Sequence, residues 1–269
     1  MNTKFIVNDY ILIWNLLFQA SISENVLNLK QYLWDNYKKK YNETYNDKAL
    51  ILKDYKNFIP NDDTIYNIVL ENKYYEKVKK QAEKYRLDVM KLWDKNKKET
   101  NNLIENVLRK DLEEYVFFVV NKETSIIEYA PKNRFIIGKS IDRDKPYNIL
   151  YEIMIHIFNS NIKGYTVKDI DFKRVVIELA VLNEYATKLT GKSYYLFGNP
   201  ELLSLKRWLY PYWLMYLGIP KGEFKEYMAR DKIYFDDTKY AYEKELKKMN
   251  IEEFIDFCIR NKRYIVREK

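Results

Sequence analysis

Glu152 and His156 are the residues whose types and spacing could carry chemistry in this sequence. They stand four positions apart in the apolar segment 150–158, so on a helix their side chains share one face. Glu184, in a later segment that is also expected to be helical, supplies a second carboxylate. These three residues are the constellation in the sequence that could carry chemistry.

The rarity of histidine and cysteine limits the metal chemistry that one chain can support. The 269 residues include one histidine, His156, and one cysteine, Cys258. A single histidine excludes the usual two-histidine zinc hydrolase site within one chain, and a single cysteine excludes a disulfide framework and a Cys-based zinc cage. Cys258 falls on the apolar face of a helix expected to start near Asn250, where we expect it to be a small buried hydrophobe.

Glycine placement separates a helical first part from a mixed second part. All six glycines lie beyond residue 137, and the glycine-free stretch before them is rich in helix-forming residues. A long helix is expected to begin near residues 63–64, after Pro60, and to run past Trp93, followed by a short helix over 100–110. Two earlier helices are indicated by apolar residues at helical spacing: Ile11, Trp14, Leu17 and Phe18, then Val26, Leu29, Leu33 and Tyr37.

Three short segments that follow have the composition of β-strands: residues 115–120, 126–130 and 134–138. Helices are then expected over 146–158, over 169–189 with Gly191 as the C-cap, from Asn199 onward, and near residues 238 and 250. The sequence thus predicts a mainly helical α+β protein. A helical N-terminal region (1–112) is followed by a region (113–269) with a small three-stranded sheet, a helix pair and further helices, packed together as one compact unit.

The order of small sheet, acid-and-histidine helix and acid-bearing helix resembles the core of a zincin metallopeptidase of the gluzincin kind. In that family the first helix carries H-E-x-x-H, and a downstream helix supplies a glutamate, often in an Asn-Glu-x-x-Ala-like context. The stretch from Asn183 to Ala186, which contains Glu184, is similar to the second motif, and Glu152 to His156 occupies the place of the first. The resemblance covers residues 115–220. It implies a zincin-like fold, zinc as the cofactor and a peptide or protein as the partner.

The first motif departs from the family pattern in both possible registers. With His156 aligned on the second metal-binding histidine, Glu152 stands at the first histidine and Ile153 at the catalytic glutamate. With Glu152 aligned on the catalytic glutamate, Tyr151 and Ile155 stand at the two ligand positions. In the first register the resemblance implies that a metal could still be held by Glu152, His156 and Glu184, an oxygen-rich set that zinc or a harder ion accepts. Zinc there could acidify a bound water, but no motif side chain would receive its proton. We therefore expect a degenerate relative that acts as a binding protein and, if any activity remains, a metal-dependent peptidase.

A dense aromatic segment over residues 208–216 is a candidate for substrate binding. Trp208, Tyr212 and Tyr216 stand at near-helical spacing and could line a groove for a peptide or a carbohydrate. A core helix with aromatic packing is the alternative, and it is the preferred interpretation. Pro211 inside this segment predicts a kink, which would suit the wall of a cleft.

The positive charge of the chain is weak evidence for nucleic acid. The formal net charge is +8, from 47 basic and 39 acidic residues, and Lys, Asn, Ile and Tyr are all abundant, as in a low-GC genome of a bacterium or phage. Residues 260–269 carry five basic and one acidic side chain, so half of the excess lies in this tail. The surface interpretation of the charge is preferred over polyanion binding.

No segment reaches the roughly 18 consecutive apolar residues that a membrane span needs, and no signal peptide is expected, so we predict a cytoplasmic protein without a membrane partner. A second function stays open beside the metallopeptidase relative. It is a protein- or nucleic-acid-binding module from a phage or mobile element, without enzymatic activity, in which tyrosines stack on bases and lysines neutralise phosphates.

Overall fold

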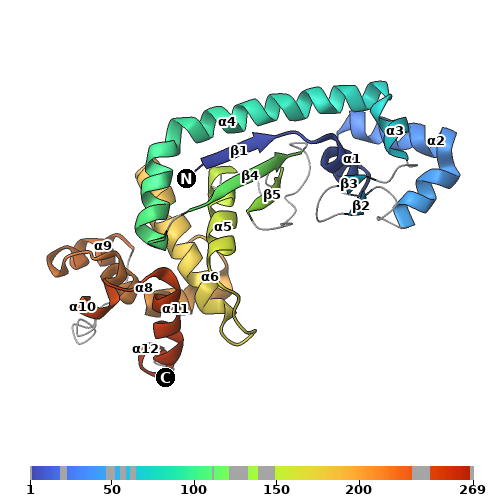
Figure 1. Cartoon of the computed structure of the whole chain (residues 1–269). Coiled ribbons are helices and arrows are strands. Elements are labelled where there is room, and N and C mark those ends of the chain that lie inside the picture. The colour runs from blue at the N-terminus through green and yellow to red at the C-terminus, as the bar shows by residue number, and fades with distance from the viewer. Residues whose placement is uncertain are drawn as a thin grey trace. The chain divides into compact units, whose positions relative to one another are not determined.

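The structure is a computed structural model that describes residues 2–18, 23–46, 52–54, 59–60, 65–110, 112–120, 133–138, 149–231 and 243–266 (Figure 1). Its described residues are mainly helical and contain a small three-stranded parallel sheet, so the predicted mainly helical α+β class is confirmed. No described helix combines the length and the apolar composition that crossing a membrane requires.

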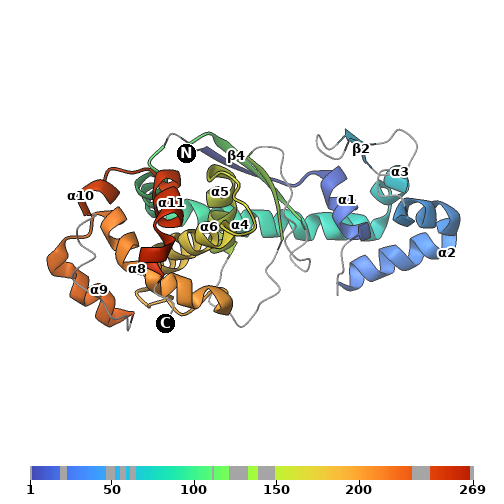
Figure 2. The ribbon, with the colours of Figure 1, turned by 90° about the horizontal axis from the view of Figure 1, so that it is seen from below.

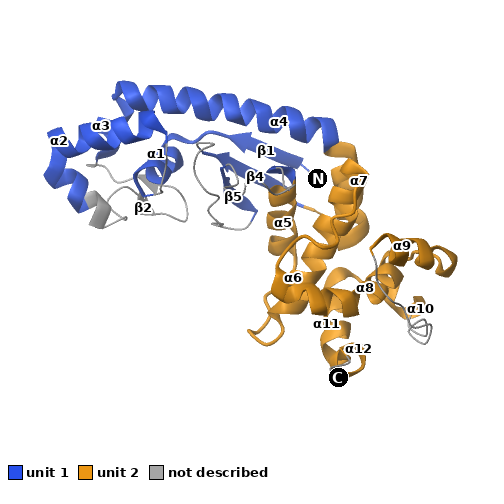
Figure 3. Ribbon diagram, turned by 180° about the vertical axis from the view of Figure 1, so that it is seen from behind, with its two compact units in different colours: residues 1–96, 113–150 blue, residues 97–112, 151–269 orange. Residues whose placement is uncertain are grey.

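The chain divides into two compact units, each made of two segments (Figure 3). Unit 1 contains residues 1–96 and 113–150, and unit 2 contains residues 97–112 and 151–269. This division differs from the expected boundary between residues 112 and 113. The physical reason is strand pairing, because the strands after residue 113 hydrogen-bond to a strand at the N-terminus and so belong with the first helices.

The sheet of unit 1 joins β1 (Asn2–Ile6), β4 (Glu114–Val119) and β5 (Arg134–Ile137) in the order β1-β4-β5, with both pairs parallel. The strands expected over 115–120 and 134–138 are present. The strand expected over 126–130 lies outside the described residues. The sequence interpretation missed β1, so the sheet is not a local insertion between helices: it includes the N-terminal segment of the chain.

Aromatic rings stack across the sheet because the strand register places them side by side. Phe5, Phe117 and Phe135 are paired in register, with ring centroids 5.2 and 5.3 Å apart. Trp93 of α4 (Lys73–Leu108) packs edge-on against Phe5 at 5.9 Å, and the hydroxyl of Tyr85, also on α4, donates to the Gly138 carbonyl. Helix α4 therefore covers this face of the sheet (Figures 1 and 2).

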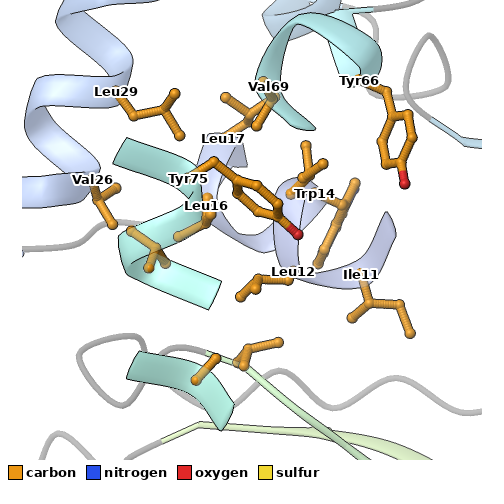
Figure 4. Close-up of a cluster of buried hydrophobic side chains, with 14 of the residues drawn as sticks. Ile11, Leu12, Trp14, Leu16, Leu17, Val26, Leu29, Tyr66, Val69 and Tyr75 are labelled. Carbon is orange, nitrogen blue, oxygen red and sulfur yellow. The ribbon is translucent and has the colours of Figure 1, made fainter. Parts of the chain in front are cut away.

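The remaining helices of unit 1 enclose a core of aliphatic and aromatic side chains (Figure 4). The core is formed by α1 (Asp9–Phe18), α2 (Glu24–Asn46), α3 (Ile65–Leu70) and the start of α4. Residues of both predicted apolar stripes belong to this core, except Tyr37 of the second stripe. Tyr37 is 37% exposed and has non-helical backbone angles, so the second stripe ends at Leu33. A short antiparallel pair, β2 (Leu52–Asp54) and β3 (Ile59–Pro60), completes the described elements of this unit.

Helix α4 is longer than the sequence interpretation expected. The separate helix over 100–110 is wrong, because α4 continues through Thr100 to Leu108. No glycine or proline interrupts the segment, and Thr100 is fully buried, with its hydroxyl hydrogen-bonded to that of Tyr185 at 2.8 Å. The break lies earlier, between α3 and α4, where the Asn72 side chain accepts from the Tyr74 backbone N–H.

The secondary-structure elements among the described residues of unit 2 are all helical. Helices α6 and α8 pack against each other, α11 packs on α6, and α10 packs on α8 (Figure 2). Its elements are α5 (Ile149–Asn161), α6 (Ile170–Glu178), the π-helix η2 (Leu179–Ala186), α7 (Thr187–Thr190), η3 (Pro200–Leu202), α8 (Leu203–Leu217), η4 (Lys221–Glu223), α9 (Phe224–Arg230), α10 (Glu243–Leu246), α11 (Ile251–Arg260) and α12 (Lys262–Ile265).

Local signals in the sequence located several ends of these helices correctly. Gly191 follows α7 in the left-handed conformation, with φ of 70°, as a C-cap glycine should. The Asn199 side chain accepts from the Glu201 backbone N–H ahead of Pro200, and Asn250 forms a capping box at the start of α11. Cys258 is fully buried on α11, as expected.

Arg109, directly after α4, ties three segments of unit 2 together. Its guanidinium donates to the carbonyls of Lys247 and Met249, each at 2.7 Å, and also to the Tyr216 carbonyl at the end of α8. The guanidinium carbon lies 4.1 Å from the centroid of the Tyr216 ring. The Tyr216 hydroxyl donates back to the Val107 carbonyl. One cation therefore satisfies a carbonyl in the last turn of α8 and two carbonyls between α10 and α11.

We expect Arg109→Ala to lower the free energy of unfolding by about 2–3 kcal/mol, because it removes charge-assisted hydrogen bonds and a cation–π contact. Arg109→Lys should recover only part of the loss, since a lysine lacks the planar fork that reaches several carbonyls. Urea denaturation measures both changes. Arg263→Lys, at an exposed position of α12, is the control and should change stability by less than about 0.5 kcal/mol. Equal stability of Arg109→Lys and the wild type would refute the role of the fork.

Candidate functional site

The structure places Glu152 and His156 on α5, one turn apart, as the sequence predicts. Most of this helix is buried: His156 is 6% exposed, and Glu152 is half-buried. Ile153, which stands at the family's catalytic glutamate in the first register, is fully buried. The side chain at this position is therefore part of the hydrophobic core.

Glu184 lies in η2, a π-helical segment between α6 and α7 that the sequence interpretation did not foresee. All eight residues of η2 are buried, and Glu184 is 7% exposed. π-helical segments are rare, and they occur frequently at functional sites. Burial raises the pKa of Glu184, against the opposing effects of Lys188 and Arg230. The protonated, neutral carboxyl is thereby favoured.

The three predicted ligands do not come together as a metal site. Among the described residues, no group of three or more His, Cys, Asp and Glu side chains could hold a metal ion, and Glu152, His156 and Glu184 all belong to these residues. Burial, which raises the pKa of the Glu184 carboxyl, also opposes metal binding, because metal ligands must lose their proton. The described placement gives no support to zinc as the cofactor, which the resemblance alone implies.

Tyrosine rings join α5 to η2. Tyr151 of α5 packs edge-on against Tyr185 of η2, with centroids 5.9 Å apart and an interplanar angle of 87°, and Tyr194 lies 6.3 Å from Tyr151. Burial raises the pKa of Tyr151 and of Tyr185 to about 12, so both phenols are neutral at physiological pH. Tyr151 is the residue that stands at a ligand position in the second register. Its side chain makes an aromatic contact there.

A buried carboxylate, Asp231, organises the polar groups around η2. It is 4% exposed and accepts from the hydroxyls of Ser193 (2.5 Å) and Tyr210 and from the Asn183 amide (3.4 Å). The Arg230 guanidinium pairs with the same carboxylate at 2.8 Å and also donates to the Tyr210 hydroxyl. Asp231 therefore connects η2, the segment after α7, α8 and the end of α9.

A second buried charge pair lies nearby in the chain and holds the segment between α7 and η3. The Lys206 ammonium, on a residue that is 1% exposed, lies 3.2 Å from the Glu178 carboxylate and donates to the Phe197 carbonyl at 2.8 Å. The other oxygen of Glu178 accepts from the Asn199 backbone N–H at 2.8 Å. Lys206 and Asp231 were missed from the sequence, since charged residues are usually solvated and nothing in the local pattern marks these two as buried.

The aromatic segment proposed for substrate binding forms part of the core of unit 2. Tyr212 is 3% exposed and Tyr216 is fully buried, while Trp208 is half-buried. Tyr216 stacks on Phe254 of α11 at 4.8 Å, and Tyr212 packs against Phe257 at 6.4 Å. The ring contacts are those of a core helix, the interpretation that the sequence favoured. A role for these three residues in substrate binding stays a prediction.

Comparison with known proteins finds no match to the chain among protein-family models, curated proteins or solved structures.

We expect Asp231→Asn to destabilise the protein by about 2–4 kcal/mol, because the buried side chain would lose its charge-assisted hydrogen bonds from Arg230, Tyr210 and Ser193. Thermal unfolding followed by circular dichroism measures the change. Ser193→Ala removes one hydrogen bond and no charge, so its effect should be smaller, about 1 kcal/mol. An effect of Asp231→Asn no larger than that of Ser193→Ala would contradict the role of Asp231 as the counter-ion.

Stability should fall in alkali as the buried phenols ionise. Tyr151 and Tyr185 have pKa values of about 12 in the folded protein, against 10 when exposed, so the unfolded chain loses these protons first. Their contribution is therefore complete below pH 10 and is lost as the pH rises from about 10 to about 12. Phenolate absorbance during a pH titration should show a late step that is smaller in Tyr185→Phe. Tyr264→Phe, at an exposed ring, is the control and should leave this step unchanged.

Proposed function

We propose that the protein is a zincin-like metallopeptidase relative with a degenerate site, and that it acts as a binding protein for a peptide or protein partner. The observation that carries the proposal is the environment of Glu184. This residue stands at the place of the family's downstream glutamate. Its carboxyl is buried, with Arg230 and Asp231 close enough to affect its pKa.

The helix α5 supports the same conclusion independently. At the place of the first motif, Ile153 is fully buried, and Tyr151 packs on Tyr185 across to η2. Neither side chain can take a proton from water at neutral pH, because one is a hydrocarbon and the other is a neutral phenol that is hard to ionise. We therefore do not expect the residues at the motif positions to act as general bases. Their buried packing stabilises the fold of unit 2 instead.

Recognition is the capacity that such a unit retains. The buried pair Lys206–Glu178 holds a surface segment in one conformation, and pre-organised segments bind partners at a lower entropic cost. A peptide or protein partner is the class that the resemblance implies.

Zinc content and peptidase activity test this proposal together. Purified wild-type protein incubated with zinc and passed through gel filtration should carry far less than one zinc per chain by elemental analysis. It should also leave casein uncleaved. His156→Ala and Glu184→Gln should not change either result. Glu184→Gln should alter stability by less than about 1 kcal/mol, since an amide of the same shape replaces a carboxyl whose charged form burial already disfavours.

The opposite outcome is equally definite. Stoichiometric zinc in the wild type that both His156→Ala and Glu184→Gln remove, together with casein cleavage lost in the same variants, would show an active metallopeptidase. If the wild type binds zinc and both variants lose it, but no casein is cleaved, the residues form a metal site. That result would overturn the proposal that the site is degenerate.

A further inference from the structure

The segment between α7 and η3 presents two apolar side chains to solvent. Leu196 is 67% exposed and Phe197 is 40% exposed, and they are adjacent in the chain. The flanking Tyr194 and Tyr195 are buried, and the Phe197 ring lies 5.3 Å from that of Tyr194. We call residues 194–199 the anchored loop. Its exposed tip is a small apolar surface next to a buried aromatic base.

The loop is held from beneath by charged groups. The Lys206 ammonium donates to the Phe197 carbonyl, and the Glu178 carboxylate accepts from the Asn199 backbone N–H. Gly198, between them, has φ of 110°, and a Cβ atom there would lie 2.3 Å from a Glu178 oxygen. The loop backbone therefore lies directly against the Glu178 carboxylate, and only glycine allows this approach.

Burying a charged pair is expensive, so its use here needs an explanation. Lys206 is 1% exposed, and burial lowers its pKa against the opposing effect of Glu178. A buried ion pair adds little net stability compared with a well-packed hydrophobic pair, whereas it does fix geometry. The geometry fixed here is that of a loop whose tip exposes leucine and phenylalanine. Fixed apolar side chains are typical of the anchors in protein–protein interfaces.

The exposed charged residues that flank the loop in the sequence, together with Arg207 of α8, are mainly basic. Lys188 and Lys192 are exposed before the loop, and Arg207, exposed on α8, lies close enough to Tyr195 to affect its pKa. Glu201 is the exposed acid that follows the loop, and the carboxylate of Glu178 is neutralised by Lys206. An acidic surface would complement this rim.

We propose that the anchored loop is a docking element for an acidic protein segment that receives Leu196 and Phe197 in an apolar contact. The proposal rests on the proposed binding function and names the partner's chemistry. Leu196 favours a protein over single-stranded nucleic acid, because bases stack on aromatic rings and the more exposed side chain of the tip is aliphatic. A second copy of the chain is disfavoured, because two basic rims would repel.

A peptide selection tests the docking element directly. The full chain is immobilised and a displayed library of random peptides is selected on it. Enriched peptides should combine acidic with apolar residues, and their affinity should fall as salt rises. The double variant Leu196→Ser/Phe197→Ser should lose at least tenfold in affinity with an unchanged melting temperature. Val167→Ser, at a 91% exposed position of another loop, is the matched control and should bind like the wild type.

A charge variant completes the experiment. The double variant Lys192→Glu/Arg207→Glu should lower the affinity for the same peptides. It should leave the melting temperature unchanged, since both side chains are exposed. The proposal is overturned if no peptide is enriched, or if the enriched peptides bind the Leu196→Ser/Phe197→Ser variant as well as the wild type. It is also overturned if the tip is required instead for binding oligo(dT), anionic vesicles or a second copy. Zinc and casein results do not bear on these outcomes, so failure of the two proposals can be told apart.

Discussion

The buried carboxylate of Asp231 is the constraint on which the described part of unit 2 depends. An isolated charge in a protein interior is very costly, so the fold has to surround it with donors. It does so with Arg230 and with side chains from η2, from the segment after α7 and from α8. Elements distant in sequence are thereby held around the Asp231 carboxylate. One of them is η2, the π-helical segment that carries Asn183 and Glu184.

Two buried or half-buried cations, Arg109 and Lys206, are also surrounded by hydrogen-bonding partners. Arg109 satisfies carbonyls at the end of α8 and before α11, and Lys206 satisfies the backbone of the anchored loop. In each case a long cationic side chain completes hydrogen bonds that no secondary structure supplies. Unit 1 is built differently. Its order comes from stacked phenylalanines across a parallel sheet and from the apolar faces of its helices.

The positions of Glu152, His156 and Glu184 explain why a sequence motif alone could not predict whether these side chains meet. Glu152 and His156 do share a turn of α5, as their spacing required, and Glu184 does lie on a later helical element. Whether such groups meet depends on how two helices face each other. Here the contact between α5 and η2 includes Tyr151 and Tyr185, and neither tyrosine was singled out for this contact by its position in the sequence.

The sequence by itself determined the mainly helical α+β class, the caps at Gly191, Asn199 and Asn250, and the burial of Cys258, because these depend on local spacing and backbone preference. Only the tertiary structure decided the rest: β1 as the partner of β4, the unbroken α4, the π-helical turn of η2, and the burial of Lys206 and Asp231. Strand pairing and charge burial depend on contacts between residues far apart in the chain, and local sequence patterns do not predict such contacts.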